Sequence, residues 1–228
     1  MTRGKLIVVE GTDCSGKETQ TKLLLEKLKS ENIPVETMSF PRYNTPTGRI
    51  VGECYLGKSG QSWFESPVTL DPLIACQYYA ADRRAAKPEI ERILASGNHL
   101  VLNRYVESNM GHQAGKANND KEREQTINFI EKLEYGLLEL PKPDQVLFLY
   151  MPYQVGMELK KGREGIADAH ESSADHLRKA EESYLWLAKK FGWAQINCTN
   201  DRTIRGLKTR EIIANEVYSR AIQLITSS

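Results

Sequence analysis

The chain has 228 residues, of which 40% are hydrophobic, and its 31 basic residues nearly balance its 30 acidic ones, for a formal net charge of +1. A chain of this length buries a full core as one domain, so we expect residues 1–228 to form a single domain. The near-zero charge excludes a global field of the kind that holds a protein on nucleic acid or on an anionic membrane. We therefore expect small-molecule partners, with no nucleic acid and no membrane among them.

The N-terminal segment and the cysteines bear on the cellular compartment. The first apolar stretch, at residues 6–9, is too short for the core of a signal peptide or for a membrane span. Cys14, Cys54, Cys76 and Cys198 lie far apart, without a C-x-x-C pair or a nearby histidine, which disfavours zinc sites and disulfide scaffolds. We expect reduced thiols and a cytoplasmic protein.

Short apolar runs rich in β-branched residues predict buried strands along the chain. They occur at residues 6–9, 35–40, 99–102, 146–150 and 194–198. Segments with helical periodicity lie at residues 17–28, 71–86, 88–95, 122–140, 174–191 and 210–225. This alternation predicts an α/β fold of about five parallel strands with helices on both faces, which binds ligands beyond the carboxyl ends of the strands.

Three local signals mark helix boundaries. Asp71 and Pro72 supply an N-cap followed by proline at the first helical position, and Gly97 follows the last turn before the strand at 99–102. Pro88 is expected to end or kink its helix, because proline removes a hydrogen bond and clashes with the preceding turn.

A glycine-rich loop follows the first predicted strand and leads directly into a helix. Its sequence, Gly11-Thr-Asp-Cys-Ser-Gly16-Lys17, matches the Walker A pattern in the setting that this pattern requires. The backbone can wrap around an anion, the helix N-terminus faces the phosphates, and Lys17 can reach the β and γ oxygens. We therefore expect a three-layer P-loop NTPase fold that binds ATP. The residues expected at the nucleotide are Gly11, Thr12, Asp13, Cys14, Ser15, Gly16, Lys17, Glu18 and Thr19.

Position 18 departs from the Walker A pattern, which normally places a Ser or Thr hydroxyl there to bind Mg²⁺. Glu18 occupies this position and Thr19 follows it. Glu18 is either a solvated acid that stabilises the helix dipole or an oxygen ligand of the metal, and both readings stay open.

A short basic segment lies before the helix predicted at 174–191. Lys160, Lys161 and Arg163 alternate with two glycines, which suits a mobile lid better than a packed element. We place this lid at about residues 156–172.

Several segments occur in the order seen in thymidylate kinases: IVVEGTDCSGKETQ, FPRYNTPTG, YYAADRRA, NRYVESNMGHQ and KGREGIADAHE. The chain thus resembles this family over most of its length. The resemblance implies transfer of the γ-phosphoryl group of ATP to thymidylate, nucleotides as the small-molecule substrates, Mg²⁺ as cofactor and a homodimer.

The resemblance also implies which residues hold the acceptor's sugar and phosphate. Asp13 matches the partner of the deoxyribose 3′-hydroxyl, with an acid in an Asx turn as the alternative. Arg42, Arg83 and Arg104 match the arginines that hold the acceptor phosphate and the transferred group, a task that suits bidentate guanidinium donors.

The acceptor's base is expected between aromatic walls. Phe40 and Tyr79 match these walls, although plain core packing would also account for both. Asn109 and Gln113 match the amides that read the base edge, since an aromatic face alone accepts any base. His112 stands where the family often has tyrosine, and we assign it no chemistry.

The catalytic role falls by resemblance to Lys17, Arg104 and Arg163. Members of the family carry an arginine either in the phosphate loop or in the lid, and Cys14 and Ser15 occupy the loop here. The lid must therefore supply it, which indicates Arg163. A solvated run of charges is the alternative reading of the basic segment.

The second departure from the family pattern is Asn103, where an Asp of the Mg²⁺ environment is normal. Together with Glu18 it suggests an exchange, in which the usual hydroxyl and carboxylate appear as carboxylate and amide with the same formal charge. We therefore predict Glu18 and Asn103 as the metal site.

Two other functions compete with a thymidylate kinase. The first is a kinase for another nucleoside monophosphate, because pocket amides alone do not separate close substrates. The second is a catalytically silent nucleotide-binding or sensing protein that has lost its metal site. A GTPase switch is disfavoured, because no N-K-x-D motif follows the fourth predicted strand.

Overall fold

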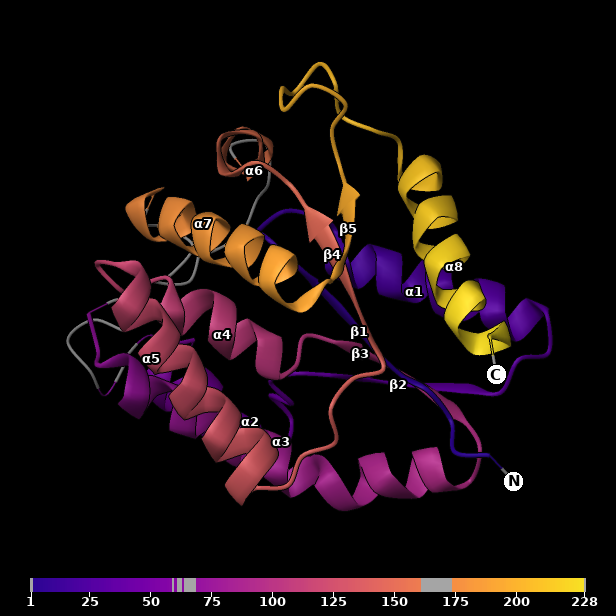
Figure 1. Ribbon diagram of the computed structural model, residues 1–228, viewed down its shortest axis with the longest axis horizontal. Coiled ribbons are helices and arrows are strands. Elements are labelled where there is room, and N and C mark those ends of the chain that lie inside the picture. Colours follow the sequence, from indigo (N-terminus) through magenta and orange to yellow (C-terminus); the bar gives the residue numbers. More distant parts are fainter. Residues whose placement is uncertain (1, 59, 61–62, 64–68, 161–173, 228) are drawn as a thin grey trace.

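A computed structural model describes residues 2–58, 60, 63, 69–160 and 174–227. Five parallel strands form one sheet in the order β2-β3-β1-β4-β5 (Figure 1). The strands are β1 (Leu6–Gly11), β2 (Val35–Ser39), β3 (His99–Asn103), β4 (Gln145–Tyr150) and β5 (Ala194–Asn197). The predicted α/β fold with about five parallel strands is confirmed.

Helices connect the strands and follow the last of them. They are α1 (Lys17–Ser30), α2 (Pro46–Arg49), the π-helix η1 (Ile50–Tyr55), α3 (Pro72–Ala95), α4 (Val106–Ala114), α5 (Asp120–Glu131), the π-helix η2 (Lys132–Leu137), α6 (Tyr153–Lys160), α7 (Ala174–Phe191) and α8 (Arg210–Thr226). Within the described ranges, no helix combines the length and the apolar character that crossing a bilayer requires.

The central strand β1 separates two hydrophobic cores, because successive side chains of a strand point to opposite faces. Leu6 and Val8 pack with residues from α3, α4, α5 and α7. Ile7 and Val9 pack with residues from α1 and α8. Figure 1 shows these two sets of helices on opposite sides of the sheet. The fold is thus three-layered, and the turn from β1 into α1 emerges at the carboxyl edge.

The predicted helical segments differ substantially from the observed helices at two places, and α2, η1, α4 and α6 were not predicted. Helix α3 runs on through Pro88, so the segments at 71–86 and 88–95 are one helix. Ala86, Ile90 and Ile93 around the proline are buried in the core, and this burial offsets the lost hydrogen bond. The segment predicted at 122–140 is instead α5 followed by η2, which ends at Leu137.

The caps of α3 agree with the sequence prediction. The carboxylate of Asp71 accepts hydrogen bonds from the N–H groups of Leu73 (2.7 Å) and Ile74 (3.3 Å). Gly97 has a φ of 85°, the left-handed conformation that a glycine adopts most readily after a helix. These two features set the length of the helix that carries Arg83.

Candidate active site

The phosphate loop joins β1 to α1 and is tied to the neighbouring strand. The hydroxyl of Thr12 donates to the carbonyl oxygen of Met151 (2.6 Å) and accepts from its N–H (2.9 Å), just after β4 ends. Gly11 lies so close to β4 that an added Cβ atom would meet the carbonyl oxygen of Leu149 at 2.5 Å. Gly16 has a φ of 82° and directs the chain into α1. The loop therefore has a fixed shape suited to enclosing an anion.

Lys17 folds back over this loop. Its Nζ donates to the carbonyl oxygens of Gly11 (3.0 Å) and Thr12 (2.9 Å), and the side chain is buried. Burial, and next the charge of Arg104, lowers the pKa of Lys17 to about 8, while Asp13 opposes the shift. A bound phosphate would stabilise the charged ammonium, because an opposite charge nearby favours the ionised form.

Asp13 and Arg104 connect the phosphate loop to the end of β3. An oxygen of Asp13 lies 3.5 Å from an Nη atom of Arg104. Burial acts to raise the pKa of Asp13, but the charge of Lys17 and other cations outweighs it and lowers the pKa to about 2. Asp13 is thus a carboxylate at neutral pH, able to accept a hydrogen bond from a ligand hydroxyl.

A pocket of about 100 Å³ opens beside Asp13. Every residue predicted to bind the acceptor lines it except Arg42: Asp13, Phe40, Tyr79, Arg83, Arg104, Asn109 and Gln113. Ser108 and His112, to which the sequence assigned no role, line it as well. We call this the acceptor pocket.

The aromatic lining residues serve the fold as well as the pocket. Phe40 is almost completely buried and lies 5.9 Å, between ring centroids, from Tyr105. Tyr79 packs its edge against Tyr55 with a centroid distance of 5.5 Å. Core packing and a pocket wall are therefore compatible readings of the same side chains.

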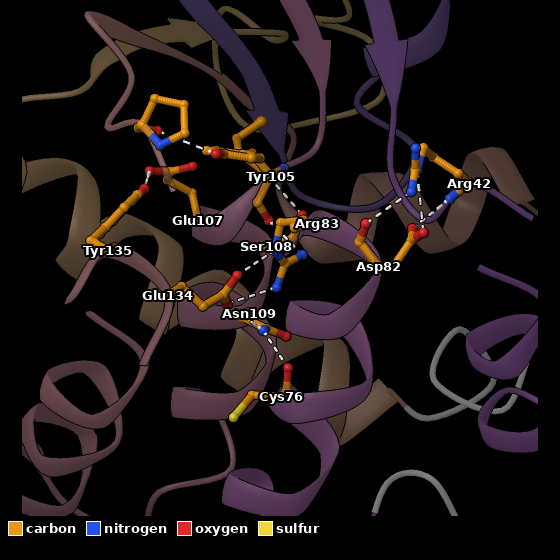
Figure 2. Close-up of polar contacts among 12 residues, drawn as sticks. Arg42, Cys76, Asp82, Arg83, Tyr105, Glu107, Ser108, Asn109, Glu134 and Tyr135 are labelled. Atoms are coloured by element: carbon orange, nitrogen blue, oxygen red, sulfur yellow. Dashed lines mark hydrogen bonds and ion pairs between the residues drawn. The ribbon is translucent and has the colours of Figure 1, made fainter. Parts of the chain in front are cut away.

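Arg83 and Asn109 meet at a buried carboxylate that the sequence analysis missed. Glu134 accepts from Nε (2.5 Å) and Nη2 (2.7 Å) of Arg83, and from the amide nitrogen of Asn109 (2.8 Å) (Figure 2). Asn109 also donates to the carbonyl oxygen of Cys76 (3.0 Å), and Arg83 donates to that of Tyr105 (3.1 Å). Glu134 lies on η2, and no local pattern marks it.

This arrangement limits what both side chains can offer a ligand. The Asn109 amide nitrogen is occupied by protein acceptors, which leaves its oxygen for a ligand, and the charge of Arg83 is balanced by Glu134. Gln113 is buried, and its Oε1 has no hydrogen-bond partner among the described residues. The Asn109 and Gln113 side chains thus provide acceptor oxygens suited to a base edge that carries an N–H group.

Arg42 lies outside the acceptor pocket but beside it, in an adjoining open groove that Phe40 and Arg104 also line. Its Nε lies 3.3 Å from Asp82, and its Nη2 donates to the Asp82 carbonyl oxygen (3.1 Å). Figure 2 shows this pair next to the Arg83 cluster. Asp82 therefore fixes a guanidinium in the groove beside the acceptor pocket.

Glu18 and Asn103, the two residues that depart from the family pattern, line this same groove. Glu18 is exposed on the first turn of α1. The Asn103 amide nitrogen donates to Ser39 Oγ (3.1 Å), while its Oδ1 is buried without a hydrogen-bond partner among the described residues.

An oxygen left without a partner is a chemically suitable ligand for Mg²⁺. This ion takes oxygen ligands and is usually held by one or two carboxylates, with substrate phosphates and water completing its shell. The described residues contain no cluster of three or more His, Cys, Asp or Glu that could hold a metal by itself. Such a cluster is not needed for Mg²⁺ at a phosphate site, so Glu18 and Asn103 fit this ion.

The predicted lid is described only at its start. Residues 156–160 belong to α6, and Lys160 lines a small pocket together with Asp13 and Cys14. Lys161 and Arg163 lie outside the described residues. Among the predicted catalytic residues, Lys17 and Arg104 meet around Asp13. The catalytic role of Arg163 stays a prediction.

The chain is similar to known proteins over most of its length. The family model for thymidylate kinase matches residues 9–209. The chain is 31% identical to thymidylate kinase from Plasmodium falciparum over 86% of its own length and 83% of that protein, and 32% identical to the Homo sapiens enzyme over 72% and 68%. A solved structure of thymidylate kinase from Candida albicans is 25% identical, covers 97% of this chain and 92% of its own, and has a TM-score of 0.69. With a match over most of its length, the chain belongs to the thymidylate kinase family.

Proposed function

We propose that this chain transfers the γ-phosphoryl group of ATP to thymidylate (dTMP), giving dTDP and ADP. The observation that carries the proposal is the meeting of Lys17 and Arg104 around Asp13, between the phosphate loop and the acceptor pocket.

The donor nucleotide is proposed to lie along the phosphate loop. Loop N–H groups and the N-terminus of α1 surround the β- and γ-phosphates, and Lys17 turns from the loop carbonyl oxygens to the phosphate oxygens. Glu18 and Asn103 would hold Mg²⁺, which neutralises charge on the phosphates as transfer proceeds.

The acceptor is proposed to lie in the acceptor pocket with its phosphate toward the loop. Arg42 and Arg104 hold that phosphate in line with the donor, and Asp13 accepts the hydrogen bond of the 3′-hydroxyl. The Asn109 and Gln113 oxygens face the base between Phe40 and Tyr79, and the neutralised Arg83 supports Asn109. Because the acceptor is already an anion, catalysis comes from positioning and charge stabilisation, without a strong general base.

A coupled assay of ADP release across nucleoside monophosphates tests the activity and the acceptor together. We expect dTMP to give the highest kcat/KM, and close pyrimidine analogues to fall short of it by about ten- to two-hundredfold. Equal rates with several acceptors would support a broader nucleotide kinase. Binding of ATP and dTMP without ADP release, even with excess Mg²⁺, would support a silent nucleotide-binding protein instead.

We also propose that two copies associate through the face formed by η1 and the start of α3. Ile50, Leu73 and Ile74 are exposed there. Ile50 and Ile74 also line a groove together with Tyr78. Neighbouring apolar side chains on an accessible surface are typical of a protein interface. The second copy suits this face because the family resemblance implies a homodimer.

Sedimentation velocity tests this association. We expect a dimer for the wild type and a monomer for Ile74→Glu, because a buried unpaired charge destabilises an apolar interface. Ile212→Glu is the matched control, since Ile212 is also exposed but lies on α8. A dimer that persists unchanged in Ile74→Glu would place the interface elsewhere.

The cellular location is proposed to be the cytoplasm. All four cysteines are described, and none of them forms a disulfide. Reduced thiols are typical of cytosolic proteins, and the substrates of the proposed reaction are intracellular nucleotides.

A further inference from the structure

Glu10, the residue before the phosphate loop, is a fully buried carboxylate that lines none of the site described above. It forms no ion pair with a Lys or Arg within the described part of the chain. Its Oε1 instead accepts hydrogen bonds from the N–H of Tyr105 (3.0 Å) and the hydroxyl of Ser108 (2.6 Å). Its Oε2 accepts one from the hydroxyl of Tyr184 on α7 (3.1 Å). Burying a carboxylate costs free energy, and at Glu10 this cost is met by three neutral hydrogen-bond donors without a cation in an ion pair within the described residues.

The end of β1 contacts the chain at Arg104 and at the residue that follows it. The Arg104 N–H donates to the carbonyl oxygen of Val9 (3.1 Å), and the next N–H along the chain, that of Tyr105, donates to Glu10. The end of β1 thus holds the N–H groups of Arg104 and Tyr105.

The backbone of Arg104, which these hydrogen bonds hold, is strained. Arg104 has a φ of 67°, a left-handed conformation that residues with a Cβ atom rarely adopt. Such a conformation costs about 1–3 kcal/mol and persists where the surrounding contacts determine it. The two hydrogen bonds from the consecutive N–H groups of Arg104 and Tyr105 to the end of β1 hold the backbone in this conformation.

Glu10 also reaches the guanidinium of Arg104, through Ser108. The Ser108 hydroxyl donates to Glu10 and lies 3.5 Å from Nη1 of Arg104, and the same Nη1 lies 3.4 Å from Nε2 of His112. Asp13 stands 3.5 Å away on the phosphate-loop side. The guanidinium is therefore set between the phosphate loop and a buried negative charge behind it.

The charges around Arg104 agree with this geometry. Burial acts to lower the pKa of Arg104, and the negative charges of Glu10 and Asp13 act to raise it. Burial and the nearby Arg104 act to lower the pKa of Lys17, and Glu10 is one of the carboxylates that oppose this. Glu10 thus offsets repulsion between the two cations that face the phosphates.

We infer that Glu10 is a positioning residue for the reaction, which fixes the backbone and the guanidinium of Arg104 so that it points to the phosphate being transferred. This inference rests on the proposed function, because the role of Arg104 does. Glu10 acts through Arg104 and touches no substrate.

Glu10→Gln in the full chain tests the inference, since glutamine keeps the shape and an acceptor oxygen but removes the charge. We expect kcat with dTMP to fall about ten- to a hundredfold, because small misplacements of a catalytic group cost that much. The KM for ATP should stay within about twofold. In an Arg104→Ala background the same substitution should change kcat little, since residues that act as one unit are not additive. An equal loss in both backgrounds would show that Glu10 acts elsewhere.

Two more variants separate positioning from folding. Ser108→Ala keeps the carboxylate but cuts its link to the guanidinium, and we expect a smaller loss of kcat that again depends on Arg104. Tyr184→Phe removes the hydroxyl that donates to Oε2 but keeps the groups that donate to Oε1, and we expect kcat within about twofold of the wild type. If Tyr184→Phe is as damaging as Glu10→Gln, or if Glu10→Gln turns over like the wild type, the assignment is wrong. A wild type that neither binds nor phosphorylates dTMP contradicts the proposed function as well.

Discussion

Replacing Glu134 by alanine is expected to lower the free energy of unfolding by about 3–5 kcal/mol, the cost of breaking a buried ion pair from one side. Both side chains of the Arg83–Glu134 pair are at most 2% exposed. Without Glu134, the guanidinium of Arg83 would stay buried with a backbone carbonyl as its remaining acceptor, and Asn109 would lose its contact at 2.8 Å. The penalty comes mainly from the unpaired charge and not from the strength of the pair itself.

Urea unfolding followed by circular dichroism measures this loss. Glu139→Ala is the matched control, because Glu139 also pairs with a residue of α3, Lys87 (3.1 Å), but its side chain is 73% exposed. Solvent screens such a pair, so we expect little change for the control. Similar effects of the two substitutions would mean that water or another carboxylate compensates Arg83.

Loss of Glu134 is also expected to weaken the binding of dTMP in the acceptor pocket. Asn109 and Arg83 line the pocket and share this carboxylate, so their side chains lose a common anchor. In the surviving folded fraction, KM for dTMP is expected to rise about tenfold, a typical effect of disturbing a group that orients a binding residue. An unchanged KM would separate the stability of the cluster from its role in binding.

The fold was largely predictable because inner strands of a parallel sheet are buried on both faces and appear as continuous apolar runs. The runs at 6–9 and 99–102 are of this kind, and the structure extends each by only one or two residues. Helix α3 was harder to predict, since the local effect of Pro88 was outweighed by burial of the residues around it.

The carboxylates that support the site were not predictable. Glu10 meets Tyr105 and Ser108, and Glu134 meets Arg83, across separations in sequence that no periodic pattern records. The phosphate loop, in contrast, is a continuous segment whose geometry depends on nearby glycines. Sequence therefore indicates the residues that face a ligand better than those that hold them in place.

A substitution at the proposed metal site is also expected to have a large effect on turnover. Glu18→Ser is expected to lower kcat with Mg²⁺ about a hundred- to a thousandfold, because loss of one group that stabilises the transferring phosphoryl costs about that much. The Mg²⁺ concentration for half-maximal rate should rise with it. Adding Asn103→Asp to Glu18→Ser should restore much of the rate, because the pair then has the hydroxyl and carboxylate expected for the family.

The structure makes this exchange physically reasonable, because both side chains line one groove beside Arg104 and the Oδ1 of Asn103 has no partner among the described residues. Glu26→Ser is the matched control: Glu26 is exposed on the same helix and borders the same groove, farther from the phosphate loop. Its turnover and Mg²⁺ dependence should match the wild type. If Glu18→Ser behaves like this control, Glu18 is only a solvated acid at the start of α1, and the metal is held without it. If Glu18→Ser is inactive and Asn103→Asp does not rescue it, the two positions do not exchange roles, and Glu18 acts on the phosphates independently of the strand.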